Sequence, residues 1–155
     1  MSMNVVLRKR QTPVMLNGNN KVVKQFPLIL RKRLPREVSI VEISEKESQR
    51  INRLYRKKNK PTNVLSFRYG SDYGEILLCP EVIRREARES GNPQEYQMTW
   101  MIVHGMIHLA GLHHERSEVL AKQTAKLEVA ILRKIFISQP NESRSLNHES
   151  RRRRK

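Results

Sequence analysis

The sequence predicts a single domain that combines α-helices with β-strands. Its 155 residues are enough for one hydrophobic core. Apolar side chains recur at helical spacing in several segments, and the longest of these is 117–136. Three short runs, 37–43, 63–67 and 75–79, have instead the alternation or the apolar content of strands. We therefore expect the helices and the strands to share one core.

The first part of the chain predicts an edge strand and an interrupted helix. Residues 4–7 are β-prone and short. Asn20 follows a turn and is a suitable N-cap for a helix whose apolar positions fall within 22–30. Pro27 lies inside this segment and predicts a kink or a late start, and Pro35 ends it.

A second helix follows the strand predicted at 37–43. Ser44 and Glu47 form a capping box, with the serine as N-cap and the glutamate three residues later. The helix runs to about residue 58, and Pro61 then breaks the chain. We expect its inward side chains to be Ile51, Leu54 and Tyr55.

The next two strands predict a hairpin. Residues 71–74 supply a turn between the strand at 63–67 and the strand at 75–79. A helix over 81–89 follows and ends at Gly91, since glycine adopts the left-handed conformation without a Cβ penalty.

Residues 98–112 predict a buried helix that carries candidate metal ligands. His104 and His108 are four residues apart, so both imidazoles leave the same helix face. Gly111 stands where the helix should end, and the chain can then turn back and bring His114 towards the other two. Three imidazoles around one point, with one position left open, are typical of a catalytic zinc site.

The third ligand has two candidates, because His113 directly precedes His114. The H-x-x-x-H-x-x-G-x-x-H spacing selects His114. The same spacing also occurs in metzincin proteases, which carry a glutamate as general base directly after the first histidine. That position is Gly105 here, so the pattern retains the metal ligands and lacks the peptidase base.

The charge of the chain indicates a polyanionic partner. Lys and Arg number 31 against 15 Asp and Glu, a formal net charge of +16. Nucleic acid is the simplest such partner. Aromatic residues make up only 5%, which argues against a stacking platform for single strands.

The C-terminal residues 138–155 predict a disordered basic tail after a folded domain at 1–137. The tail has no apolar period and ends in four arginines and a lysine. It would either bind phosphates or only keep the protein soluble.

Several features predict a cytoplasmic protein. No apolar run reaches the length of a membrane span, and the N-terminus lacks a signal-peptide core. Cys79 is the single cysteine, so no disulfide can form within the chain.

The histidine run and the segment Lys60-Pro61-Thr62-Asn63-Val64-Leu65-Ser66-Phe67 together resemble the YbeY family of bacterial endoribonucleases and ribosomal RNA maturation factors. The resemblance covers roughly residues 38–135. It implies one α+β domain with a mixed sheet of about four strands, several helices and a metal site at the end of a central buried helix. It also implies cleavage of single-stranded RNA, maturation of the 16S rRNA 3′ end and ribosome quality control, with the small ribosomal subunit as partner.

Residue by residue, the resemblance places the family's zinc ligands on His104, His108 and His114, with one Zn²⁺ ion. It places a basic residue implicated in catalysis on Arg56; without the resemblance, Arg56 would be taken for a surface arginine at a helix C-terminus. The neighbouring lysines are candidate RNA contacts: Lys57, Lys58 and Lys60.

The chain departs from the family pattern at Leu112-His113, where a Tyr-Asp pair is usual, at Asn59 and at Glu75. Two alternatives to the nuclease remain open. One is a protease-like hydrolase without its glutamate base. The other is a non-catalytic RNA- or ribosome-binding factor with a structural zinc, whose fourth ligand would have to be Cys79.

Overall fold

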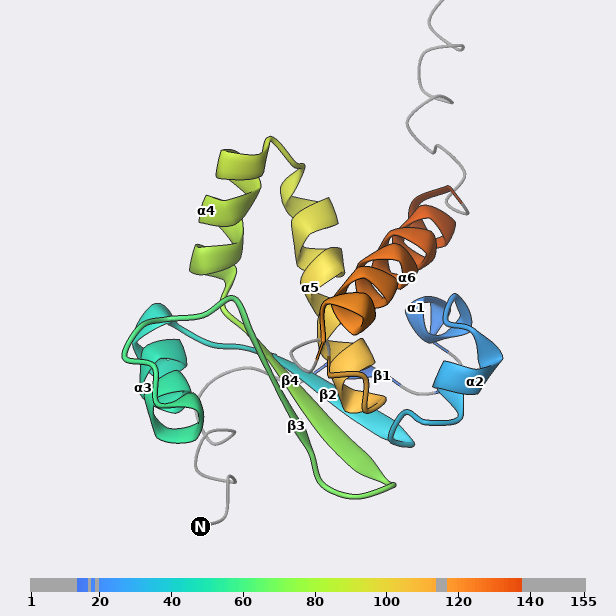
Figure 1. Ribbon diagram of the computed structural model, residues 1–155. Coiled ribbons are helices and arrows are strands. Elements are labelled where there is room, and N and C mark those ends of the chain that lie inside the picture. Colours follow the sequence, from blue (N-terminus) through green and yellow to red (C-terminus); the bar gives the residue numbers. More distant parts are fainter. Residues whose placement is uncertain (1–13, 17, 19, 114–116, 138–155) are drawn as a thin grey trace, which may run out of the picture.

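A four-stranded sheet with helices on both of its faces forms the protein (Figure 1). The computed structural model describes residues 14–16, 18, 20–113 and 117–137. Its strands are β1 (Val14–Leu16), β2 (Glu37–Glu42), β3 (Val64–Arg68) and β4 (Tyr73–Leu78). Its helices are α1 (Lys21–Lys24), α2 (Leu28–Arg31), α3 (Glu45–Arg56), α4 (Pro80–Ser90), α5 (Gln94–Leu109) and α6 (Glu118–Ile137). The expected α+β class is confirmed.

The sheet is mixed, with the strand order β1-β2-β4-β3. The predicted hairpin is present, because β3 pairs antiparallel with β4 and Ser66 lies opposite Ile76. β2 runs parallel to β4, and β1 pairs antiparallel with β2 at the edge. The strand expected at 4–7 lies outside the described residues. β1 was not predicted from the sequence.

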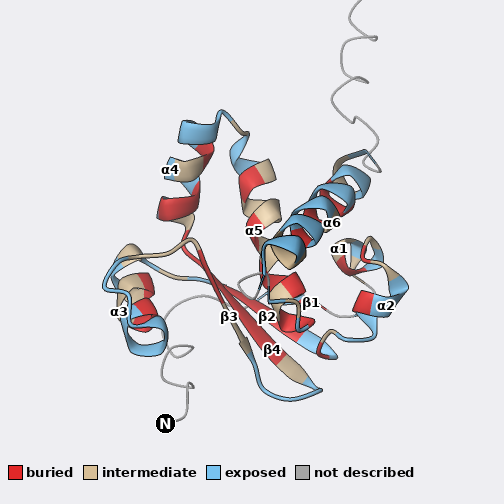
Figure 2. Ribbon diagram, in the orientation of Figure 1, coloured by how far each residue is buried: buried red, intermediate tan, exposed pale blue. Residues whose placement is uncertain are grey.

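Each face of the sheet has its own core, and the central strands β2 and β4 are buried except at their ends (Figure 2). Side chains such as Val38, Ile76 and Leu78 pack with α5 and α6 on one face. On the other face, α3 contributes Ile51 to a smaller cluster whose other buried members are Val41, Leu65 and Leu77. The sheet thus separates α3 from the helix that carries the histidines.

The burial of α3 differs from the sequence prediction. Ile51 is fully buried as expected, but Leu54 and Tyr55 are about half exposed, so the inward assignment of these two was wrong. Ser48 and Asn52 are buried in their place. Ser48 Oγ donates to the Thr62 carbonyl and Asn52 Nδ2 donates to the Lys60 carbonyl, both at 2.8 Å. These polar residues face inward because they satisfy the backbone of the loop that leads to β3.

The helix expected within 22–30 is divided into α1 and α2. Asn20 caps α1 by accepting from the Val22 backbone at 2.8 Å, as predicted. Pro27 is the N-cap residue of α2, so the late start suggested by this proline is confirmed.

α5 crosses the sheet at close range. A Cβ built on Gly105 would lie 3.0 Å from Ser66 Oγ and 3.1 Å from two side-chain carbons of Ile76. A Cβ built on Gly74 of β4 would lie 3.2 Å from a side-chain carbon of Leu109 on α5. The two glycines allow the helix to lie directly against β3 and β4, which brings its histidines to the edge of these strands.

The other helix ends agree well with the sequence prediction. α4 ends at Gly91 with φ +69°, and Gly111 has φ +87° just after α5. α6 buries Thr124, Ile131 and Leu132. It also buries Glu128, a charged residue that the apolar periodicity of 117–136 did not identify as buried. None of the described helices is long and apolar enough to cross a membrane.

Candidate metal centre

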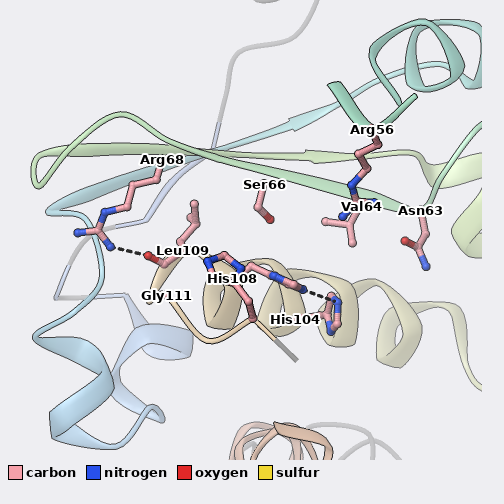
Figure 3. Close-up of a pocket in the computed structure, with 10 residues that line it drawn as sticks. Arg56, Asn63, Val64, Ser66, Arg68, His104, His108, Leu109 and Gly111 are labelled. Atoms are coloured by element: carbon pink, nitrogen blue, oxygen red, sulfur yellow. Dashed lines mark hydrogen bonds between the residues drawn. The ribbon is translucent and has the colours of Figure 1, made fainter. Parts of the chain in front are cut away.

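A cleft opens where α5 lies against β3 (Figure 3). Its volume is about 530 Å³. Figure 3 shows two histidines along α5, with Arg56 and Arg68 above them towards opposite ends of the cleft. The lining consists of Arg56, Asn63, Val64, Ser66, Arg68, His104, His108, Leu109, Gly111 and His113.

His104 and His108 face each other in this cleft. Their Nε2 atoms lie 3.1 Å apart and their ring centroids 4.7 Å apart. Two imidazole nitrogens that bind one zinc ion tetrahedrally at ~2.0–2.1 Å would be about 3.3 Å from each other. The observed pair is therefore close to the spacing of two ligands of one ion. The predicted convergence of these two histidines is confirmed.

Glu128 of α6 orients the first histidine. Its Oε1 is 2.5 Å from His104 Nδ1, and its Oε2 accepts from Trp100 Nε1 at 2.8 Å. A carboxylate only accepts hydrogen bonds, so Nδ1 of His104 carries a proton, and in the neutral imidazole Nε2 presents its lone pair to the cleft. A carboxylate behind a histidine in this way is common at zinc sites, where it fixes the tautomer. The donor set thus fits a zinc ion.

Sequence reasoning missed Glu128, although a signal was present. Thr124, Glu128 and Ile131 recur at helical spacing, so a glutamate occupies the buried face of an amphipathic helix. A buried carboxylate requires a partner. Glu128 has two such partners on α5, the imidazole of His104 and the indole of Trp100.

For a zinc ion held by His104 and His108, replacing Glu128 by glutamine should weaken the binding without abolishing it. The amide has nearly the same shape, but it no longer fixes the His104 tautomer through a charged hydrogen bond. Partners of this kind are worth about 10–100-fold in metal affinity. Competition against a chromophoric chelator measures the effect. The matched control is Glu118→Gln at the exposed start of the same helix, which should bind zinc as the wild type does.

The third ligand predicted from the sequence, His114, lies outside the described residues. Its neighbour His113 is exposed and lines the cleft, with its ring centroid 5.8 Å from that of His108. Gly111, in the turn after α5, has φ +87° and also lines the cleft. The choice between these two histidines remains a prediction that follows the motif spacing.

Arg56 is the last residue of α3 and lines the cleft, as the sequence resemblance implied. Lys57 ends the helix in the left-handed conformation, with φ +59°. The loop beyond it is held by Ser48, whose Oγ also accepts from the Thr62 backbone at 2.9 Å. α3 packs on the face of the sheet opposite α5. Its C-terminal residue Arg56 nevertheless lines the cleft that contains His104 and His108.

The three candidate lysines do not line the cleft. Lys57, Lys58 and Lys60 are exposed on the loop after α3. Arg68 and Asn63 lie in the cleft instead, and sequence reasoning assigned no role to either. Arg68 Nη1 donates to the carbonyl of Leu109 at 2.5 Å and to that of Arg33 at 2.6 Å. The guanidinium thus binds the last turn of α5, where the helix dipole favours a cation.

Cys79 is poorly suited to be a zinc ligand. It is fully buried at the start of α4 and is not part of the cleft lining. Burial raises the pKa of its thiol, which disfavours the thiolate that a metal requires. The alternative of a structural zinc site completed by this cysteine therefore has no support from the geometry.

The fold and the cleft define a small single-domain α+β protein with a histidine- and arginine-lined cleft at a helix–strand junction. Comparison with known proteins gives the family. Residues 8–136 match the family model described as "Endoribonuclease YbeY", and the chain belongs to the YbeY family.

Curated relatives agree with this family. The chain is 38% identical over 109 residues to "Endoribonuclease YbeY" of Burkholderia ambifaria, a match that covers 67% of this chain and 62% of that protein. It is 34% identical over 122 residues to the Magnetococcus marinus protein of the same name, with 68% of this chain and 83% of the relative covered. The solution structure of TM1509 from Thermotoga maritima is similar in fold, with a TM-score of 0.53 and 28% identity. That match covers 83% of this chain and 85% of the other.

Proposed function

We propose that this protein is a zinc-dependent endoribonuclease that cleaves single-stranded RNA. The observation that carries the proposal is the pair of imidazoles on α5, 3.1 Å apart at Nε2 and opposite Arg56 in one open cleft. The names of the relatives, which are endoribonucleases, support the same activity. The net charge of +16 supports a polyanionic substrate.

His104, His108 and His114 would hold the ion. A bound zinc ion supplies a Lewis acid for a phosphoryl oxygen and makes a coordinated water more acidic. The carboxylate of Glu128 keeps the His104 tautomer correct for ligation. None of the described residues that line the cleft is an aspartate or a glutamate, so the lining offers no carboxylate as general base. Ser66, which also lines the cleft, carries a neutral hydroxyl.

The two arginines of the cleft would bind the RNA backbone. The guanidinium of Arg56 can reach two phosphate oxygens at once and stabilises charge that develops on the phosphoryl group. Arg68 already donates to backbone carbonyls, so its charge is fixed in position rather than free to follow the substrate. Arg56 is therefore the catalytic candidate, and Arg68 provides a constant positive field.

Replacing Arg56 by alanine should leave zinc binding unchanged and lower the rate of RNA cleavage by about 100-fold or more, because the variant loses a cation at the reacting phosphate. Bound zinc and single-turnover cleavage of a labelled oligonucleotide measure the two quantities. Arg53→Ala is the matched control, since Arg53 is exposed on the same helix and does not line the cleft. Cleavage by Arg56→Ala at the wild-type rate would remove Arg56 from the mechanism.

The substrate proposed is ribosomal RNA near the 3′ end of the 16S molecule, with the small ribosomal subunit as partner in the cytoplasm. The family resemblance supports this choice. A synthetic RNA that spans the mature 3′ end, offered as a single strand and as a duplex, tests it. We expect chelator-sensitive cleavage of the single strand only. Equal cleavage of both forms would contradict strand specificity.

A further inference from the structure

A second cavity adjoins the cleft on the other side of His104. Its volume is about 370 Å³, within the range of pockets that hold small ligands, ~300–1,000 Å³. It lies between α4, α5 and α6, and it shares Asn63 and His104 with the cleft. The full lining is Asn63, Glu86, Glu89, Ser90, Gln97, Trp100, Met101, His104 and Glu128. The two hollows are therefore neighbours on either side of His104, and together they are called the groove below.

The two parts of this groove carry opposite charges. Among the described residues, the cleft is lined by Arg56 and Arg68 and by no carboxylate, whereas the second cavity is lined by three glutamates and by no lysine or arginine. An RNA phosphate is attracted to the first part and repelled by the second. A nucleobase is neutral and can donate hydrogen bonds to carboxylates. On the basis of charge, the phosphate of a nucleotide is therefore expected in the cleft and its base in the second cavity.

We propose that the second cavity is a nucleobase subsite that binds the base next to the scissile phosphate and prefers guanine. This deepens the proposed function and rests on it for the position of the phosphate. Single-stranded RNA is recognised in this way, by extruded bases that bind through their Watson–Crick edges and stack on aromatic side chains. The base preference of the enzyme would then be determined by α4 and α5 rather than by the cleft.

Glu86 and Gln97 supply the groups that distinguish guanine. Glu86 is held in place by Asn63, whose Nδ2 donates to both carboxylate oxygens at 3.0 and 3.2 Å. A carboxylate has about four lone-pair sites, so these oxygens can still accept from the N1–H and N2–H₂ groups of guanine. Gln97 is only 3% exposed, and its Oε1 accepts from Asn92, so its amide group is oriented with Nε2 as the remaining donor. The O6 atom of guanine is a suitable acceptor for it.

Uracil presents two carbonyls around a single N–H, so it has an acceptor where guanine has its second donor. It would place a carbonyl against the carboxylate of Glu86. Inosine lacks only the N2 amino group of guanosine, so it should bind with an intermediate affinity. The order guanosine, inosine, uridine is therefore specific to this arrangement of donors and acceptors.

Trp100 makes the proposal directly testable. It is the single tryptophan of the chain, it lines the second cavity, and its indole nitrogen is held by Glu128. Its fluorescence and the resonance of its indole N–H therefore report on this cavity, provided that the zinc content is the same in every sample, because Glu128 also contacts His104. Free nucleosides carry no phosphate, so their binding does not depend on the cleft or on catalysis.

The experiment titrates the full-length protein with guanosine, inosine and uridine and follows the Trp100 signal. We expect guanosine to bind about tenfold more tightly than uridine. Glu86→Gln should reduce this ratio to near one, and Glu81→Gln, at an exposed position of the same helix that does not line the cavity, should leave it unchanged. Gln97→Met, a variant that leaves Glu86 and Asn63 intact, should reduce guanosine binding and leave uridine binding as it was.

Equal affinities for guanosine and uridine, or a Trp100 signal that no nucleoside changes, would overturn the proposal. An unchanged ratio in folded Glu86→Gln would do the same. A second arm measures cleavage of RNAs that differ in one base beside the cut site. If nucleosides bind as expected but no RNA is cut, the nuclease proposal fails and the base subsite stands. If RNA is cut without base preference and nucleosides do not bind, only the subsite fails.

Discussion

Replacing His108 by alanine should abolish zinc binding and RNA cleavage together. His108 supplies one of the two nitrogens that lie 3.1 Å apart, and no other described side chain stands at that position. A zinc site with two protein ligands holds its ion far more weakly than one with three. We expect less than one tenth of the wild-type zinc content after dialysis and no cleavage above background.

The fold should survive this change, because His108 is partly exposed at the cleft and its loss creates no closed cavity in the core. Circular dichroism and thermal melting check this point. The matched control is His113→Ala, which removes a cleft histidine that the motif spacing does not select. Retention of zinc and cleavage by His108→Ala would contradict the metal centre. Loss of zinc in His113→Ala with retention in His114→Ala would move the third ligand to His113.

Replacing Gly105 by glutamate should unfold or severely destabilise the protein. The variant restores the glutamate of the protease pattern, but its Cβ would lie 3.0 Å from Ser66 Oγ and 3.1 Å from Ile76, with no room for the rest of the side chain. Overpacking of this kind costs about 1–3 kcal/mol, and an unpaired buried carboxylate adds several more. We expect a large fall in melting temperature and no peptidase activity on denatured casein.

The control for this change is Gln94→Glu, which places the same residue at an exposed position at the start of α5. It should melt at or slightly above the wild-type temperature, because a carboxylate there complements the helix dipole. Gly105→Glu protein that is as stable as the wild type and hydrolyses casein would revive the protease alternative. The close contact between α5 and the sheet is thus the physical reason why this position carries no general base.

Local signals predicted most of the elements and the meeting of two histidine rings in the cleft. The capping residues Asn20 and Ser44 and the C-terminal Gly91 act on backbone groups only a few residues away in the sequence. For this reason they placed helix ends correctly. The four-residue spacing of His104 and His108 is also a local property, and it correctly brought both rings to one face.

The parts that could not be predicted depend on contacts between distant segments. Glu128 reaches His104 across 24 residues of sequence, and Arg68 reaches Leu109 across 41. Leu54 was expected to be buried on the basis of its apolar character. Asn52 displaced it because the loop after α3 needed a hydrogen-bond donor for the Lys60 carbonyl. Helical periodicity identifies a buried face but does not reveal which polar groups a later loop will require.

X-ray absorption at the zinc edge of the zinc-loaded protein tests the central claim most directly. We predict three imidazole nitrogens and one oxygen donor around the ion, all at ~2.0–2.1 Å. A sulfur atom at ~2.3 Å would mean that Cys79 binds the metal and that the site is structural. Fewer than two imidazoles in the spectrum would contradict the assignment of His104 and His108 as a ligand pair.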